Sequence, residues 1–348
     1  MAILYGKTYT RRELEARVGS MKQLADLRAA EMTGGREAGT KILELTNGVL
    51  SATVVPGRCL DVANFTYRGI PLNFTGKCGV VYAGLAEPVE NPLRSVNGGM
   101  FYTCGLSNVG NAYGDDYFHG RVRLIPAEQL STFAGWEGDE YVLRCSGIMR
   151  ECSVCGDNLS LERHIETTLG SREIRVSDTV CNDGFRPAPF MMMYHLVFGF
   201  PLLDAESRLY LPVAPGELGE KTCFAAAPTP DGIDNGGGLF RALANDEGFS
   251  TYCMYNPTLG VGLEVSFDAR PMPYLSQWKS MQSGDYAMGL MPTNCKAGGR
   301  QREIDGGTLR HLAGGEVVKT SLTLRAIEGE GELAETLAKI ENCKNTVE

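Results

Sequence analysis

The sequence has little positive charge, few histidines and no long apolar run, and these scarcities exclude several classes of protein. Its 33 Lys and Arg residues are outnumbered by 42 Asp and Glu residues, and the net charge of −9 argues against a nucleic-acid surface. The most apolar segment, residues 189–203, contains His195 and is too short for a membrane span. Residues 1–7 are too short an apolar stretch for a secretion signal. We therefore expect a cytoplasmic protein that binds neither nucleic acid nor membrane.

Recognisable cofactor and metal motifs are also missing. No GxGxxG motif follows a predicted strand and there is no Walker loop, so nucleotide binding has little support. The 11 cysteines are an odd number scattered along a long chain, unlike the framework of a small secreted protein. The close pair Cys152 and Cys155 has no second CxxC to complete a tetrahedral zinc site. We expect reduced thiols, no cofactor and no bound metal.

Helical signals are confined to the two ends of the chain. Residues 10–27 carry the clearest one, because Thr10 and Glu13 have the spacing of a capping box. Gly19 is expected to break this stretch into two short helices. The other candidate helix covers residues 333–341.

Between these ends, short apolar runs alternate with turn residues, which is typical of an all-β protein. Residues 40–45 and 50–55 flank Asn47-Gly48, a strong hairpin signal. Within residues 157–168, Arg163 shares a strand face with apolar residues, whereas His164 lies on the opposite face. Further strands are predicted at 141–145, 171–181, 209–211, 250–255, 261–267 and 316–326. The pattern favours a β-sandwich or a barrel.

Two short segments hold two of the four histidines in settings that suggest chemistry. His119 lies in Tyr117-Phe118-His119-Gly120-Arg121, and His195 lies in the segment 194–201. Histidine exchanges protons near neutral pH, so the pair suggests a proton-transfer site. The alternatives are a structural His119 and a neutral core His195 that is bonded to backbone. His164 and His311 lack comparable surroundings and are expected at the surface.

Other residues could bind a polyhydroxylated ligand or serve structure alone. Arg58 and Asp61 form a local ion pair or grip vicinal hydroxyls, since guanidinium donates and carboxylate accepts. The paired glycines in residues 94–100 allow close approach of a ligand, or form a tight turn. Trp278 beside Lys279 suits the apolar face and the oxygens of a sugar, or is a core Trp with an exposed Lys.

In their order along the chain, these segments resemble the DUF4432 group of aldose-1-epimerase-like proteins, in the galactose mutarotase-like superfamily. The resemblance covers residues 10 to about 325. It implies a large single-domain β-sandwich of the supersandwich type, with the site in a cleft on one sheet. A helical lead would cover residues 1–30, the sandwich residues 31–326 and a tail residues 327–348. The matching segments are Arg58–Asp61, Arg94–Gly99, Thr103–Leu106, His119–Arg121, Tyr194–Pro201, Gln277–Lys279 and Gly284–Cys295.

The resemblance also implies roles for individual residues. Mutarotases interconvert sugar anomers with two histidines and a glutamate, through ring opening, rotation of the C1 carbonyl and ring closure. By motif, His195 would be the acid at the ring oxygen, and His119 would hydrogen-bond a substrate hydroxyl or the same oxygen. Polar clamps and further substrate-binding residues would be Arg58, Arg94, Lys279, Asp61, Arg121, Tyr194, Trp278, Met291 and Asn294.

One departure from the family pattern bears on the reaction. The segment that usually reads Gly-Leu-Glu-Pro, with Glu as the base, is Gly-Leu-Met-Pro here, so Met291 replaces the base. General-base assistance is worth ~10²–10⁴-fold, so mutarotase activity should be weak unless Asp285, Glu264 or Asp61 substitutes. We expect an aldose-1-epimerase-type enzyme. The alternatives are a lyase or isomerase on an oxidised sugar, and a non-catalytic sugar-binding protein. The partner is a small sugar or sugar derivative, and a homodimer is left open.

Overall fold

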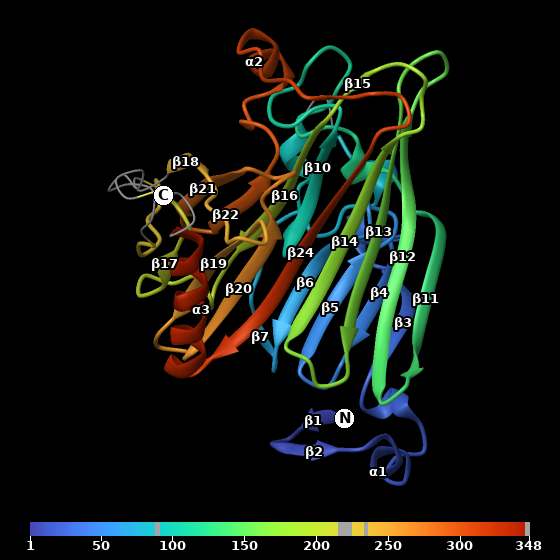
Figure 1. Ribbon diagram of the computed structural model, residues 1–348, viewed down its shortest axis with the longest axis vertical. Coiled ribbons are helices and arrows are strands. Elements are labelled where there is room, and N and C mark those ends of the chain that lie inside the picture. Colours follow the sequence, from blue (N-terminus) through green and yellow to red (C-terminus); the bar gives the residue numbers. More distant parts are fainter. Residues whose placement is uncertain (88–90, 215–224, 233–235, 345–348) are drawn as a thin grey trace.

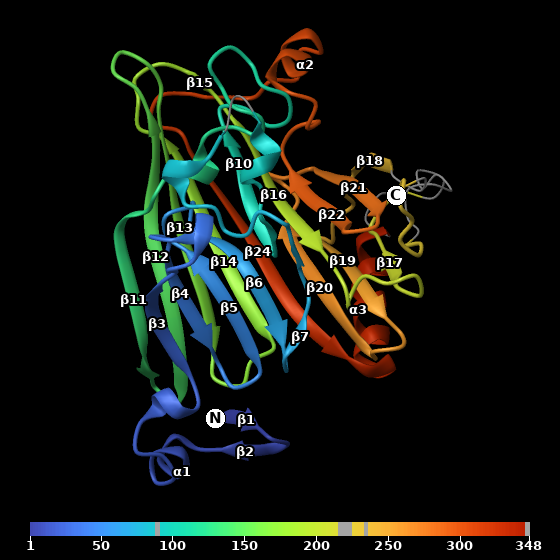
Figure 2. The ribbon, with the colours of Figure 1, turned by 180° about the vertical axis from the view of Figure 1, so that it is seen from behind.

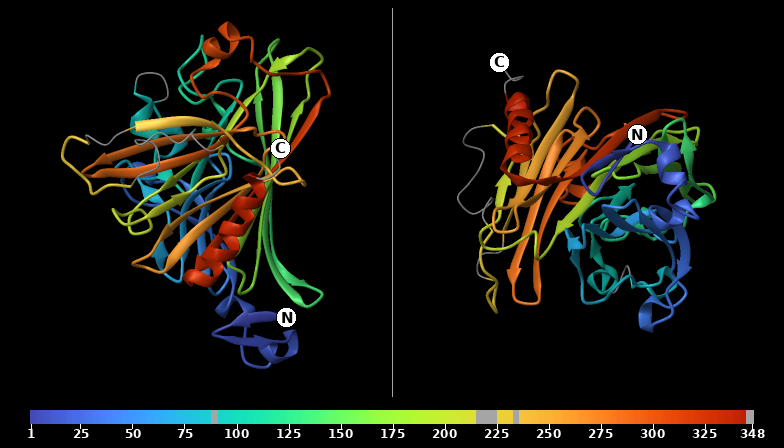
Figure 3. Two further views of the ribbon diagram at one scale, coloured as in Figure 1. Left: turned by 60° about the vertical axis from the view of Figure 1, so that its left-hand side comes forward. Right: turned by 90° about the horizontal axis from the view of Figure 1, so that it is seen from below.

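Two large antiparallel sheets pack face to face in the computed structural model, which describes residues 1–87, 91–214, 225–232 and 236–344 (Figures 1 and 3). The ten-stranded sheet has the order β18 (Gly236–Arg241), β21 (Tyr274–Gln282), β22 (Asp285–Thr293), β16 (Met191–Phe198), β10 (Phe101–Leu106), β6 (Asp61–Tyr67), β5 (Leu50–Val55), β4 (Lys41–Thr46) and β3 (Asp26–Glu31), and β7 (Ile70–Pro71) pairs with β6. The eight-stranded sheet has the order β11 (Glu128–Glu137), β12 (Glu140–Cys152), β13 (Asn158–Thr168), β14 (Glu173–Asn182), β24 (Val317–Glu328), β20 (Val261–Asp268), β19 (Phe249–Asn256) and β17 (Arg208–Tyr210).

The remaining elements are short and lie at the edges and ends of the sandwich. Three two-stranded ladders join β1 (Ala2–Leu4) to β2 (Lys7–Tyr9), β8 (Phe74–Thr75) to β9 (Gly98–Gly99), and β15 (Ala188–Pro189) to β23 (His311–Leu312). The helices are α1 (Arg11–Glu15), α2 (Arg300–Asp305) and α3 (Gly329–Lys344), with 3₁₀ turns η1 (Met21–Gln23), η2 (Gly35–Glu37), η3 (Ala83–Leu85), η4 (Pro92–Ser95) and η5 (Val122–Leu124). Among the described residues, no helix has both the length and the apolar character needed to cross a membrane.

The main core fills the space between the two sheets, because each strand turns every second side chain inward. The predicted alternation is confirmed on β13, where Leu161 and Ile165 are buried and His164 is exposed. Arg163 joins the buried face and is fully buried. It donates to both oxygens of Asp178, at 2.9 and 2.6 Å, and to Asp61 Oδ1 at 2.9 Å. The two acceptors compensate the cost of burying this guanidinium.

The predicted β elements agree better with the structure than the predicted N-terminal helix does. The hairpin at Asn47-Gly48 is confirmed as β4 and β5. The capping box at Thr10 is present, but α1 ends at Glu15, and β3 begins at Asp26, inside the expected helical stretch. Pairing with β4 stabilises that segment as a strand. A short isolated helix is less stable, because helix nucleation is costly.

The C-terminal helix is longer than expected. It covers Gly329–Lys344 and packs its apolar face, including Leu333 and Ile340, against Cys253 and Tyr255 of β19 (Figure 1). All the cysteines in the described part of the chain are free thiols.

Candidate active site

The strand β16 carries two different surfaces because its side chains alternate across the sheet. Tyr194 and Leu196 point into the core between the sheets. Met193 and Val197 belong to a second apolar cluster on the opposite, outer face of the ten-stranded sheet. His195 lies between them on this outer face, and its strand β16 is an inner strand of the sheet, between β22 and β10 (Figure 2). His195 is thereby held in place by a paired strand of the sheet.

The register of the neighbouring strands selects the partners of His195. Tyr102 of β10 pairs directly with His195, and the two rings stack with centroids 4.3 Å apart and planes 15° apart. On the other side, the register between β16 and β22 places Met291 next to His195. A Cβ at Gly289 would lie 3.5 Å from both the His195 Cε1 and the Met291 Cε, so the two side chains border the same space.

His119 reaches the same pocket from the loop between β10 and η5. Its backbone is left-handed, with φ at 63°, and is held by hydrogen bonds from its N–H to Gly110 and from Gly105 N–H to its carbonyl. The following residue must be Gly120, because a Cβ there would overlap the Gly105 carbonyl oxygen. This conformation brings the His119 ring to 5.4 Å from the His195 ring, centroid to centroid.

The two histidines open into a cavity of about 410 Å³. The hydrogen-bonding side chains that line it are few, and the rest of the surface is aliphatic, aromatic or thioether. The lining residues are Phe74, Leu93, Val96, Gly98, Tyr102, Gly110, Asn111, Phe118, His119, Met193, His195, Val197, Ser276, Trp278, Met291 and Ala297. We call this cavity the histidine pocket. Its volume is in the range of small-molecule sites.

Burial keeps both histidines neutral. It lowers the pKa of His195 to about 3, and it holds the pKa of His119 well below 6.5, with a smaller contribution from His195. The buried guanidinium of Arg123 in η5 lowers both further, and none of its nitrogens has a partner among the described residues. Burial and the nearby positive charge of Arg123 therefore make an imidazolium unfavourable in either position.

The hydrogen bonds determine which ring nitrogens can meet a ligand. His119 Nδ1 accepts from Gly110 N–H at 3.2 Å, so the proton of the neutral ring is on Nε2. His195 Nδ1 is buried without a partner among the described residues, so Nε2 is the nitrogen left to face the cavity. The site thus combines an N–H donor on His119 with a nitrogen of His195 that is open to a ligand.

Four of the residues predicted for the site line the histidine pocket. His119 and His195 face each other, Met291 lies beside His195, and Trp278 is 45% exposed at the cavity wall. Trp278 is therefore not the core residue of the alternative interpretation. Met291 lines the cavity and is only 3% exposed.

One predicted clamp, Arg58, and two predicted substrate contacts, Asp61 and Tyr194, are not among the described residues that line the histidine pocket. Arg58 is buried and donates to the carbonyls of Val81 and Ser95, at 3.1 and 2.9 Å, so it fastens loops. Asp61 accepts from Thr103 and Arg163, and Tyr194 donates to Asp178 at 2.8 Å. Asp61 and Tyr194 belong to the polar network between the sheets, because Asp61 binds the buried Arg163 and Tyr194 binds Asp178, the other acceptor of Arg163. Asp61 pairs with Arg163 at 2.9 Å, and Arg58 binds the two backbone carbonyls, so among the described residues this geometry shows neither a local ion pair between Arg58 and Asp61 nor their joint grip on hydroxyls.

The other predicted residues also lie away from the cavity wall. Arg94 is largely exposed and pairs with Glu87 at 3.5 Å. Lys279 is buried on the face of β21 opposite Trp278, because neighbouring residues of a strand alternate. Asn294 accepts from Met192 N–H at 2.7 Å and donates to the Phe190 carbonyl, so it ties β22 to β16. None of these three is among the described residues that line the histidine pocket.

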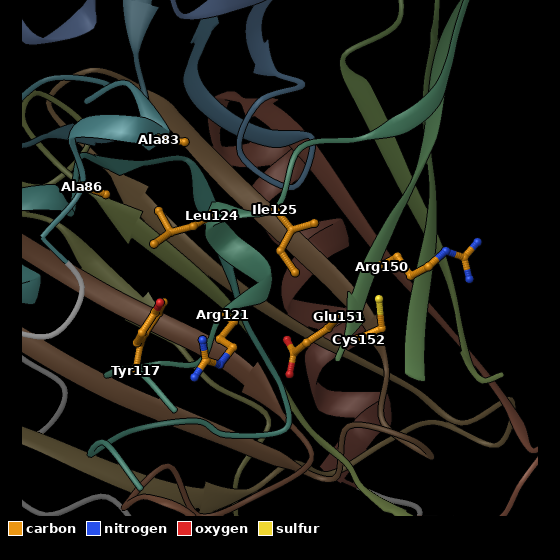
Figure 4. Close-up of a pocket in the computed structure, with 9 residues that line it drawn as sticks. All are labelled: Ala83, Ala86, Tyr117, Arg121, Leu124, Ile125, Arg150, Glu151 and Cys152. Carbon is orange, nitrogen blue, oxygen red and sulfur yellow. The ribbon is translucent and has the colours of Figure 1, made fainter. Parts of the chain in front are cut away.

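Arg121 borders a different cavity, of about 600 Å³ (Figure 4). It pairs with Asp116 at 3.2 Å and stacks over the Tyr117 ring at 4.4 Å. Across this cavity lies Glu151, whose carboxylate accepts from Leu106 N–H at 2.8 Å and from the Ser107 hydroxyl at 2.6 Å. These contacts hold the loop between β10 and η5, which carries His119.

No carboxylate replaces the missing glutamate among the described residues that line the histidine pocket. Asp285 pairs with Lys77 at 2.7 Å, and Glu264 binds Lys339 of α3 at 2.7 Å. Asp61 is held in the core network. The described residues likewise contain no group of three or more His, Cys, Asp or Glu side chains that could hold a metal ion.

Several contributors to the site were missed from the sequence. Tyr102 stacks on His195, Asn111 and Ser276 line the cavity, and Arg123 supplies a buried charge. No strand was predicted at residues 101–106, and only the pairing of β10 with β16 places Tyr102 on His195. No local pattern indicates Arg123, which lies outside the two long sheets.

Comparisons with known proteins agree with this geometry. A family model described as a domain of unknown function, DUF4432, matches residues 37–326. A solved structure from Klebsiella pneumoniae, described as a candidate aldose 1-epimerase, is 20% identical with a TM-score of 0.84, covering 93% of this chain and 90% of that chain. A galactose mutarotase-like protein from Clostridium acetobutylicum is 15% identical with a TM-score of 0.58, covering 87% and 99%. The β-sandwich of this type is therefore confirmed. No curated protein matches the chain.

Proposed function

Because this chain belongs to the DUF4432 family and has the fold of galactose mutarotase-like proteins, we propose that it binds a reducing sugar and interconverts its anomers. The names of its structural neighbours favour sugar chemistry, but fold alone does not establish a reaction. The observation that carries the proposal is the pair of neutral histidines, 5.4 Å apart, that open into one cavity.

The proposed mechanism uses His195 as the proton carrier. Its Nε2 takes the proton of the anomeric hydroxyl, the bond between C1 and the ring oxygen breaks, and the electron pair goes to the ring oxygen. His119 Nε2–H donates a hydrogen bond to that oxygen, and His195 then returns the proton to it. The open-chain aldehyde rotates about its C1–C2 bond, and the same steps in reverse close the other anomer.

The electrostatics of the pocket predict a slow enzyme. A base with a pKa of about 3 accepts protons poorly near pH 7, and Met291 cannot assist it. His195 therefore serves as both base and acid in the proposal, whereas the sequence assigned it only the acid role. His119 keeps its expected role as a hydrogen-bond donor.

The decisive experiment restores a carboxylate beside His195. We would measure anomer exchange by NMR for the wild type, Met291→Glu, the uncharged control Met291→Gln, and His195→Asn. Since general-base assistance is worth ~10²–10⁴-fold, Met291→Glu should accelerate exchange by at least tenfold and Met291→Gln should not. His195→Asn should reduce exchange to the spontaneous rate. Full activity in folded His195→Asn protein would remove His195 from the mechanism.

A second candidate function is sugar binding without turnover. It is favoured by the absence of a carboxylate among the described lining residues and by the lowered pKa of His195. Ligand-induced stabilisation of the wild type, combined with exchange at the spontaneous rate, would support this function instead. The lyase or isomerase alternative gains no comparable support, because a histidine with a pKa of about 3 is a weak base for a carbon-bound proton.

A further inference from the structure

The histidine pocket is less polar than a site for a fully hydroxylated sugar needs to be. Apart from the two histidines, the purely polar residues among the described part of its wall are Asn111 and Ser276. Tyr102 and Trp278 add one polar atom each, at the end of a large apolar ring. A hexose presents a hydroxyl on almost every carbon, so most of its hydroxyls would face apolar groups here.

The apolar groups lie next to the proposed reaction centre, where a bound sugar would be enclosed. Met193 and Val197 flank His195 on the same face of β16, and both are buried within the outer apolar cluster. Met291 closes the side toward β22. Phe74 of β8 and Phe118 of the loop between β10 and η5 complete the wall. These side chains are not confined to the rim, so the ligand cannot avoid them.

Unpaired hydroxyls in such a pocket weaken binding. A hydroxyl that leaves water without gaining a hydrogen bond costs enough to reduce affinity by roughly tenfold or more. A hydrogen, methyl or alkoxy group at the same position carries no such cost and gains contact with the apolar wall. The lining therefore discriminates against the fully hydroxylated sugar.

We propose that the pocket selects a reducing sugar of reduced polarity, in which at least one hydroxyl is replaced by hydrogen or carries an alkyl group. This inference rests on the proposed function for the position of the anomeric carbon. The inference concerns affinity, however, whereas the proposed function concerns turnover, so they are tested by different measurements.

The test uses matched pairs of sugars that differ at one position. Calorimetric binding would compare 6-deoxygalactose with galactose, and 2-deoxyglucose and 3-O-methylglucose with glucose. At least one substituted sugar should bind roughly tenfold more tightly than its parent. Parents that bind as tightly as every substituted partner, or a complete lack of binding by both members of every pair, would overturn the inference.

Two variants of lining residues test whether the apolar lining of the histidine pocket causes the preference for the substituted sugar. Leu93 is 67% exposed at the pocket, so Leu93→Gln adds polarity with little risk to folding, and Val197→Thr adds a hydroxyl beside His195 with almost no change in shape. Both should shrink the preference for the substituted sugar severalfold. Leu130→Gln, on the edge strand β11, is the matched control and should keep it. An unchanged preference in both lining variants would also overturn the inference.

Anomer exchange, measured on the same pairs, separates the two proposals. Tighter binding of a substituted sugar without exchange above the spontaneous rate would defeat the proposed reaction and support the inference. Exchange that is fastest on galactose or glucose, together with their tighter binding, would support the reaction and defeat the inference.

Discussion

The neutral state of the buried histidines predicts how the stability of the protein depends on pH. Burial lowers the pKa of His195 from 6.5 in the unfolded chain to about 3 in the folded protein. Below pH 6.5, His195 takes up a proton in the unfolded chain but stays neutral in the folded protein. The stability associated with His195 is therefore complete above pH 6.5, falls as the pH decreases toward 3, and is constant below that.

The size of the effect follows from the two pKa values. Between pH 7 and pH 5, the unfolded chain gains most of one proton at position 195, which lowers the free energy of unfolding by about 2 kcal/mol. Asp61 acts in the opposite direction, because burial raises its pKa to about 6 and the folded state then gains a proton. His119 and Asp61 are present in both proteins to be compared, so their contributions cancel in a difference.

The assay is urea unfolding of the wild type and His195→Gln at pH 7 and pH 5. Between pH 7 and pH 5, the free energy of unfolding of the wild type should fall by about 2 kcal/mol more than that of His195→Gln, whatever the absolute stability of the variant. Val197→Thr changes the same strand face without removing the titrating group, so it should lose as much as the wild type. Equal losses in wild type and His195→Gln would refute the reasoning, because His195 would then take up its proton as readily when folded as when unfolded.

Two further predictions test the framework of the site. Gly120→Ala should destabilise the protein by at least about 3 kcal/mol in urea unfolding, because its Cβ would overlap Gly105 and its φ is 78°. Gly114→Ala, with a positive φ but open space, should cost only about 1 kcal/mol, and equal costs would contradict the packing argument. Tyr194→Phe removes the 2.8 Å hydrogen bond to Asp178 and should cost ~1–3 kcal/mol of stability, yet leave sugar affinity unchanged, because Tyr194 points away from the pocket. A calorimetric loss of sugar affinity would contradict this orientation.

Much of the fold was predictable because strand signals are local. The hairpin at Asn47-Gly48 and the alternation around Arg163 depend on turn chemistry and on a two-residue period, which neighbouring residues reveal. Residues 26 and 27 were misassigned to a helix because the pairing of β3 with β4 outweighs a weak helical preference. Strand pairing of this kind is a tertiary interaction, and a helical pattern does not report it.

The sequence by itself determined the family, singled out His119 and His195 as candidates, and showed a methionine at position 291. Motifs retain the identity and order of residues, and these were enough for those conclusions. Only the tertiary structure decided which candidates share a surface. Adjacent strand residues point to opposite faces, so His195 and Tyr194 differ completely in environment, and the register across β10, β16 and β22 assembled Tyr102, His195 and Met291 from distant segments. The apolar character of the pocket emerged in the same way, since it belongs to the packing of several strands and loops and to no single motif.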